Sequence, residues 1–210
     1  MTINNNILNE INKDLSFYNN AKLMIVTKNQ SIQDIESLIS KGYKLFGENR
    51  VQEAKQKYEQ MLINENLELH MIGPLQTNKV KMALKIFDTI QSIDRYSLVD
   101  EICKVSKKNI CRTKKFYIQV NIGDENQKSG VHVKDLNDLY TYSIKKKLQI
   151  IGLMCIPPDI EDPSEYFELM KNIRNKIDKN LNLSMGMSND YKIALNYNSN
   201  MIRIGSLIFS

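Results

Sequence analysis

Eight short apolar runs recur along the chain, and each alternates with a stretch of helical pattern. The first, over residues 22–27, contains four consecutive apolar residues, as in a strand that is covered on both faces. Seven further runs have the length of strands, at 43–46, 67–72, 87–90, 116–122, 148–156, 181–185 and 201–204. Strands that alternate regularly with helices form parallel sheets, so the sequence predicts an α/β fold. Eight such units favour a single closed (β/α)8 barrel of the TIM type.

An open, doubly wound sheet is the alternative arrangement of the same units. Such sheets usually carry a Gly-rich dinucleotide fingerprint after the first strand, whereas here that turn reads Lys28-Asn29-Gln30. No linker or low-complexity stretch separates the units, so residues 1–210 are expected to form one domain. Apolar residues at helical spacing over residues 2–18 predict an additional helix before the barrel.

The composition is that of a soluble globular protein, with 42% hydrophobic residues and no run of the roughly 20 apolar residues that a membrane span needs. The three cysteines, Cys103, Cys111 and Cys155, are an odd number without metal spacing, which fits a reducing cytosol. The first residues lack the pattern of a secretory signal, so we expect a cytoplasmic protein. The two histidines, His70 and His132, lie far apart and predict no metal site.

The net charge of +5 comes mostly from bases that are scattered along predicted helix faces. Residues 145–147 form the only dense basic run, and no aromatic-rich strand lies beside it to stack bases, so nucleic-acid binding is not favoured. The positive balance is better suited to attracting an anionic metabolite.

Lys28 follows the first predicted strand, where α/β proteins bind their ligands. An amine that loses water there is more easily deprotonated, and a neutral amine can attack an aldehyde to form a Schiff base. The alternative is a solvated lysine just past a strand end. Asn49 ends the neighbouring second strand and is a candidate to hydrogen-bond a ring oxygen, although it could also be a turn residue before a helix. His70, within the third strand, is expected to be a hydrogen-bonded core residue.

The loops after the last two strands of such barrels commonly hold a phosphate. Here they pair glycine, which lets backbone N–H groups approach an anion, with the hydroxyls of Ser188 and Ser206. Arg203 adds a fixed charge, and Lys28 lies on the strand that would neighbour the eighth in a closed barrel. An imine-forming amine beside a phosphate cradle suggests pyridoxal 5′-phosphate as cofactor, or else a phosphorylated sugar aldehyde.

Several motifs occur together and in one order along the chain: Val26-Thr-Lys28, Phe46-Gly-Glu-Asn49 with Val51-Gln-Glu53, His70–Lys79, Lys128-Ser-Gly130, Leu183–Ser188 and Arg203-Ile-Gly205. In these motifs the chain resembles the YggS/PROSC-type pyridoxal phosphate homeostasis proteins. The resemblance implies a barrel like the N-terminal domain of alanine racemase and pyridoxal 5′-phosphate bound to Lys28 as an imine. It also implies that Ser188, Gly205 and Ser206 are phosphate ligands and that Arg203 faces the pyridine nitrogen.

The chain departs from the family pattern at a few positions. Arg50 stands in place of a tyrosine, Asn189 in place of a common aspartate and Asn200 in place of a common threonine. Ser206 replaces the usual threonine and keeps the hydroxyl. The chain stops at Ser210, where relatives usually continue for a short helix.

The expected function is binding, buffering or delivery of pyridoxal 5′-phosphate within the cell, without established catalytic activity. An arginine at the ring nitrogen disfavours the protonation that most pyridoxal enzymes need, and the sequence shows no obvious second acid or base opposite Lys28. The alternative is a racemase-like enzyme or a Schiff-base aldolase, but a barrel that uses all 210 residues leaves no room for the second domain of racemases. Apo-enzymes that depend on pyridoxal 5′-phosphate (PLP) are possible receivers of the cofactor. The resemblance to the family also leads us to expect a monomer.

Overall fold

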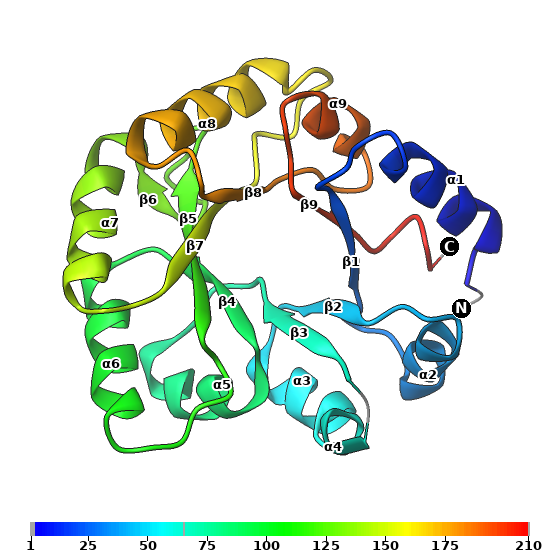
Figure 1. Cartoon of the computed structure of the whole chain (residues 1–210), viewed down its shortest axis with the longest axis horizontal. Helices are drawn as coiled ribbons and strands as arrows, with labels where there is room; N and C mark the ends of the chain where they lie inside the picture. Colours follow the sequence, from blue (N-terminus) through cyan, green and yellow to red (C-terminus); the bar gives the residue numbers. More distant parts are fainter. Residues whose placement is uncertain (1–2, 65, 210) are drawn as a thin grey trace.

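Eight parallel strands close into a ring in a computed structural model of the chain, which describes residues 3–64 and 66–209. Neighbouring strands pair in the order β4-β3-β2-β1-β9-β8-β7-β5, and a further pairing of β4 with β5 closes the barrel. This confirms the predicted barrel (Figure 1). The strands of the ring are β1 (Lys22–Val26), β2 (Leu45–Glu48), β3 (Glu68–Met71), β4 (Thr89–Ile93), β5 (Lys115–Asn121), β7 (Ile150–Cys155), β8 (Asn182–Ser184) and β9 (Met201–Ile204).

Helices surround the ring on its outer side (Figure 1). They are α1 (Asn5–Leu15), α2 (Ile32–Ser40), α3 (Val51–Tyr58), α4 (Met61–Asn64), α5 (Val80–Ile86), α6 (Tyr96–Ser106), α7 (Leu136–Lys145), α8 (Ser164–Ile177) and α9 (Tyr191–Asn196), with 3-10 turns at Thr77–Lys79 and Val133–Asp135. No helix in the described ranges is both long and apolar enough to cross a membrane.

The additional N-terminal helix is present as α1, which buries Leu8 and Ile11. The backbone N–H of Asn4 donates to the carbonyl of Ile208, so the start of α1 lies beside the end of the chain (Figure 1). Thr2 of the predicted helix 2–18, like Met1 and Ser210 of the predicted domain, lies outside the described residues.

Local sequence signals set the bounds of the elements. At the start of α2 the Ser31 hydroxyl accepts from the N–H of Asp34, and the Asp34 carboxylate accepts from the Ser31 N–H, which is a capping box. The same helix ends before Gly42, whose φ of 89° is in the left-handed region that glycine tolerates.

The second strand differs from its predicted range of 43–46, because it begins at Leu45 and continues through Glu48. An apolar pattern cannot predict a strand that ends in a fully buried glutamate. The strand continues because Thr27 and Lys57 supply partners for that carboxylate. The four-residue α4 and the two-residue β6 (Val131–His132), which pairs with β5, were not predicted, since neither is long enough to show a period.

The interior of the barrel contains buried polar side chains. Gln91 of β4 bonds to His70 of β3 and to Ser184 of β8, so polar contacts cross the space that the ring encloses. His70 is 1% exposed, as expected of a core histidine. The polar interior leads directly to the candidate site, because Arg203 of β9 is part of it.

Candidate functional site

A cavity of about 1030 Å³ opens at the carboxyl ends of the barrel strands. Its lining comes from the residues at or just after the ends of most of the strands, since parallel strands in a ring present these ends on the same side. All of the residues predicted from the sequence as cofactor ligands line this one cavity: Lys28, Asn49, Ser188, Arg203, Gly205 and Ser206. The structure therefore brings the predicted residues together, while their individual roles stay predictions.

Lys28 lies two residues beyond the end of β1, and its side chain is exposed. Its Nζ makes no hydrogen bond or ion pair with another described residue, so the amine is available to a ligand in the cavity. Asn49 directly follows β2, which pairs with β1 and so places the amide next to the Lys28 turn.

The turns after β8 and β9 meet at a pair of hydroxyl groups. The Ser206 hydroxyl donates to the Ser188 hydroxyl at 2.9 Å. A Cβ at Gly205 would lie 3.1 Å from the carbonyl oxygen of Val26, so glycine lets this turn pack closely against β1. Two adjacent hydroxyls beside a close-packed glycine turn can donate to the oxygens of one anion.

Arg203 is a buried cation held by neutral groups. Its Nη1 donates to the Ser184 hydroxyl at 2.9 Å and its Nη2 donates to the carbonyl of Cys155 at 2.8 Å. Among the described residues no carboxylate forms an ion pair with it. Burial lowers the pKa of Arg203 from its ordinary value, but a guanidinium still remains charged at neutral pH. Such a charge at the cavity wall disfavours a proton on any nitrogen placed next to it.

A chain of buried hydrogen bonds continues from Arg203 across the barrel. The Ser184 hydroxyl donates to Gln91 Oε1 at 2.7 Å, and Gln91 Nε2 lies 2.8 Å from His70 Nδ1. Because an amide nitrogen only donates, His70 Nδ1 accepts and its proton is on Nε2, which then donates to Glu68 Oε1 at 2.9 Å. This hydrogen bond from His70 lowers the pKa of Glu68. This chain of hydrogen bonds from Arg203 through Ser184, Gln91 and His70 to Glu68, called the relay below, fixes the position of Ser184. It thereby supports one of the two contacts of Arg203.

Sequence reasoning did not single out Gln91, Ser184 or Lys128 as parts of the site. The first two are polar residues at inward positions of apolar strands, which is a signal that could have identified them. Lys128 lines the cavity as a second amine, but its Nζ donates to the Pro157 carbonyl at 2.9 Å and pairs with Glu125 at 2.6 Å.

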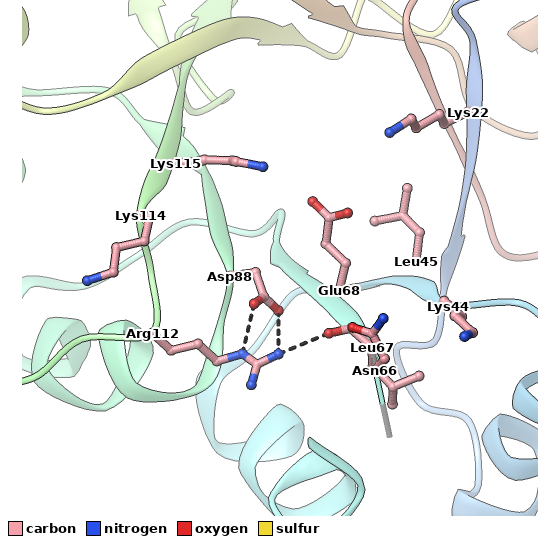
Figure 2. A pocket seen from close by; sticks show the side chains of 10 residues that line it. All are labelled: Lys22, Lys44, Leu45, Asn66, Leu67, Glu68, Asp88, Arg112, Lys114 and Lys115. Carbon is pink, nitrogen blue, oxygen red and sulfur yellow. Dashed lines mark hydrogen bonds and ion pairs between the residues drawn. The ribbon is translucent and has the colours of Figure 1, made fainter. Parts of the chain in front are cut away.

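A second cavity of about 490 Å³ lies at the opposite end of the barrel, at the amino ends of the strands. Figure 2 shows Lys22 and Lys115 pointing toward it from opposite sides, with Glu68 between them and with Asp88 paired to Arg112. Ligand chemistry in such barrels is carried by the carboxyl ends of the strands, so the larger cavity is the candidate site. No group of three or more potential metal ligands occurs in the part of the chain that the structure describes.

Comparisons with known proteins agree with this geometry. The family model "Alanine racemase, N-terminal domain" matches residues 4–210. The chain is 39% identical over 200 residues to the pyridoxal phosphate homeostasis protein of Aquifex aeolicus, covering 91% of this chain and 87% of that protein. It is 34% identical over 206 residues to the protein of the same name in Pasteurella multocida, with 90% and 85% covered.

Solved structures show the same relationship. PipY of Synechococcus elongatus without PLP superposes with a TM-score of 0.89 at 28% identity, over 97% of this chain and 98% of that one. PipY with PLP bound superposes with a TM-score of 0.81 at 27% identity, over 97% and 98%. Alanine racemase of Clostridium difficile, at 13% identity, shares the fold with a TM-score of 0.74, and only 57% of its length is covered, against 99% of this chain. By its sequence and its barrel, this chain belongs to the family of pyridoxal phosphate homeostasis proteins.

Proposed function

We propose that the protein binds pyridoxal 5′-phosphate in the cavity at the carboxyl ends of its strands and takes part in intracellular homeostasis of this cofactor. The observation that carries the proposal is the convergence of an exposed lysine amine, a hydroxyl pair on a glycine turn and a buried arginine on one cavity. Relatives that share at least a third of the residues are named for this role, and PipY has been solved with PLP bound.

Each part of the cofactor has a complementary group in the cavity. Ser188, Ser206 and the Gly205 backbone would hold the phosphate, and Lys28 would bind the aldehyde carbon covalently. As the resemblance to the family implies, Arg203 would face the pyridine nitrogen, and its positive charge suits an unprotonated nitrogen that accepts a hydrogen bond. Asn49 would hydrogen-bond the ring oxygen. When bound, the cofactor supplies an aldehyde that condenses reversibly with amines.

The same features favour a carrier over an enzyme. Electron-sink chemistry usually relies on an acidic partner that keeps the ring nitrogen protonated, whereas Arg203 opposes protonation. No tyrosine or histidine is among the described residues that line the cavity, and the acid or base groups there besides Lys28 are Lys128, Asp159, Glu161 and Asp190. We therefore propose that the protein holds, buffers or delivers the cofactor without catalytic turnover, with PLP-dependent apo-enzymes as receivers.

Reductive trapping tests the proposal. Purified protein is incubated with pyridoxal 5′-phosphate, reduced with borohydride and digested, and the labelled peptide is identified by mass. We expect the label on Lys28 and its loss in Lys28→Ala. Label on other lysines alone would reject the site. Turnover of amino acids at about 1 to 1000 per second, abolished by Lys28→Ala, would instead favour a racemase-like enzyme.

A further inference from the structure

Both peptide groups that flank Lys28 are bound by side chains of helix α3. Lys57 Nζ donates to the carbonyl of Thr27 at 2.7 Å, and Glu53 accepts from the backbone N–H of Asn29 at 2.5 Å. Glu53 and Lys57 are one helical turn apart and also form an ion pair with each other. A single ion pair on a neighbouring helix therefore brackets the residue that is proposed to carry the cofactor.

The ion pair rests on a buried polar cluster. The Thr27 hydroxyl donates to Glu48 at 2.8 Å, and Lys57 donates to the same carboxylate at 3.1 Å. Since the Thr27 proton is used in this bond, the Tyr58 hydroxyl donates to Thr27 at 2.7 Å. Glu48 is fully buried and the side chain of Lys57 is only 10% exposed. Burial raises the pKa of Glu48, although Lys57 and the hydrogen bond from Thr27 act in the opposite direction.

The turn that Glu53 holds has an uncommon backbone conformation. Asn29 has a φ of 61°, in the left-handed region that residues other than glycine seldom adopt. The chain reverses there directly after Lys28, and the carboxylate of Glu53 satisfies the N–H that this reversal leaves outside the sheet. Burial on its own would raise the pKa of Glu53, but the hydrogen bonds from Lys57 and Asn29 outweigh it and lower that pKa, so the acceptor is charged at neutral pH.

We infer that Glu53 and Lys57 are positioning residues, which hold the Lys28 amine where it meets the cofactor's aldehyde. This inference rests on the proposed function. It also gives a role to Glu48 of the Phe46-Gly-Glu-Asn49 motif and to Glu53 of the Val51-Gln-Glu53 motif. These two glutamates neither line the cavity nor contact the side chain of Lys28. Covalent bond formation depends steeply on placement, because an error of about 1 Å can cost about 100-fold. In the proposal, phosphate binding depends on the turns after β8 and β9, and the hydrogen bonds that the α3 side chains make outside their helix go instead, among the described residues, to Thr27, Asn29 and Glu48.

The experiment separates the covalent step from non-covalent binding. The rate and extent of Schiff-base formation are followed by absorbance and by borohydride trapping on wild type, Glu53→Ala and Glu53→Gln. Affinity for pyridoxal 5′-phosphate is measured again with each change placed in a Lys28→Ala background. We expect Glu53→Ala to slow or weaken the covalent step about 10- to 100-fold and to leave the non-covalent affinity unchanged. Glu53→Gln keeps an acceptor for the Asn29 N–H and should recover part of the loss.

The same helix provides a matched control. Lys55 and Glu59 are also four residues apart and paired, at 3.8 Å, but their side chains are 46% and 58% exposed, so Glu59→Ala removes the same charge without touching the Lys28 turn. If Glu53→Ala lowers protein yield, the double variant Glu48→Gln/Lys57→Met tests the ion pair from its other side. It removes the donor to the Thr27 carbonyl and the partner of Glu53, and it leaves no charge on Glu48. It should show the same selective loss.

Equal covalent binding in Glu53→Ala and Glu59→Ala would overturn the inference and leave the proposed function intact. The inference would also be overturned if Glu53→Ala lowered the non-covalent affinity in the Lys28→Ala background as much as it lowered covalent binding. Glu53 would then support the cavity as a whole. If the wild type forms no Schiff base at Lys28, the proposed function fails, and the inference fails with it.

Discussion

At the scale of single residues, the environment of Arg203 makes a prediction about the bound cofactor. Replacing Arg203 by glutamine keeps a donor near Ser184 but removes the charge from the cavity wall. A proton on the ring nitrogen then becomes easier to accommodate, so the midpoint of the absorbance titration of loaded protein should rise by about 1 to 3 pH units. Lys22→Gln, which removes one positive charge at the opposite end of the barrel, is the control. An unchanged titration in Arg203→Gln would mean that this arginine does not face the ring nitrogen.

The assignment of Ser206 as a phosphate ligand can be tested by removing its hydroxyl group. Ser206→Ala removes a hydroxyl that now bonds to Ser188 and, in the proposal, to a phosphate oxygen. Loss of a hydrogen bond to a charged group costs about 1.5–3 kcal/mol, or about 10- to 150-fold in affinity. The affinity of the variant for pyridoxal 5′-phosphate should fall by this factor, while the affinity for pyridoxal, which lacks the phosphate, should not. Equal losses for the two ligands would remove Ser206 from the anion site.

At the scale of elements, the sequence predicts those features that are set by residues close together in the chain, such as the bounds of strands. The range 201–204 agrees with β9, and 22–27 differs from β1 by one residue, because their apolar runs are bounded by polar residues or turns. The predicted ligands line one cavity because the barrel fixes which strand ends meet. The hydrogen bonds of Gln91 in the relay and the contact of Glu53 with the Lys28 turn were not predicted, since they join residues 21 to 93 positions apart and leave no periodic signal.

The relay between β3, β4 and β8 predicts a cost in stability. Gln91→Leu removes the partner of both His70 Nδ1 and the Ser184 hydroxyl in a fully buried position. Each buried group that loses its partner costs about 1–3 kcal/mol, so the free energy of unfolding should fall by at least about 2 kcal/mol in urea titrations. Gln149→Leu, at an exposed position, should change it little. A Gln91→Leu protein as stable as wild type would show that the relay does not stabilise the barrel.

At the scale of the whole molecule, the two ends of the barrel have different chemistry. The amino ends carry Lys22 and Lys115 around Glu68, while the carboxyl ends bring hydroxyls, Arg203 and the Lys28 amine to the larger cavity. The relay from Arg203 to Glu68 connects these ends through the interior. Since the ligand cavity is assembled from strands all around the ring, a ligand that binds there must stabilise the closed barrel as a unit.

This linkage gives a prediction about thermal unfolding. A ligand at 100 times its Kd stabilises the folded state by about 2.7 kcal/mol, which for a chain of this length raises Tm by about 5 to 10 °C. Pyridoxal 5′-phosphate should raise the Tm of wild type most, and the Tm of Lys28→Ala less at the same concentration, because only the anion contacts remain. Pyridoxal reports any stabilisation that comes from aldehyde chemistry at other lysines, and it should have little effect on Lys28→Ala. An equal Tm shift for wild type and Lys28→Ala would show that the covalent bond contributes nothing to holding the cofactor, and the binding site would then be an anion site alone.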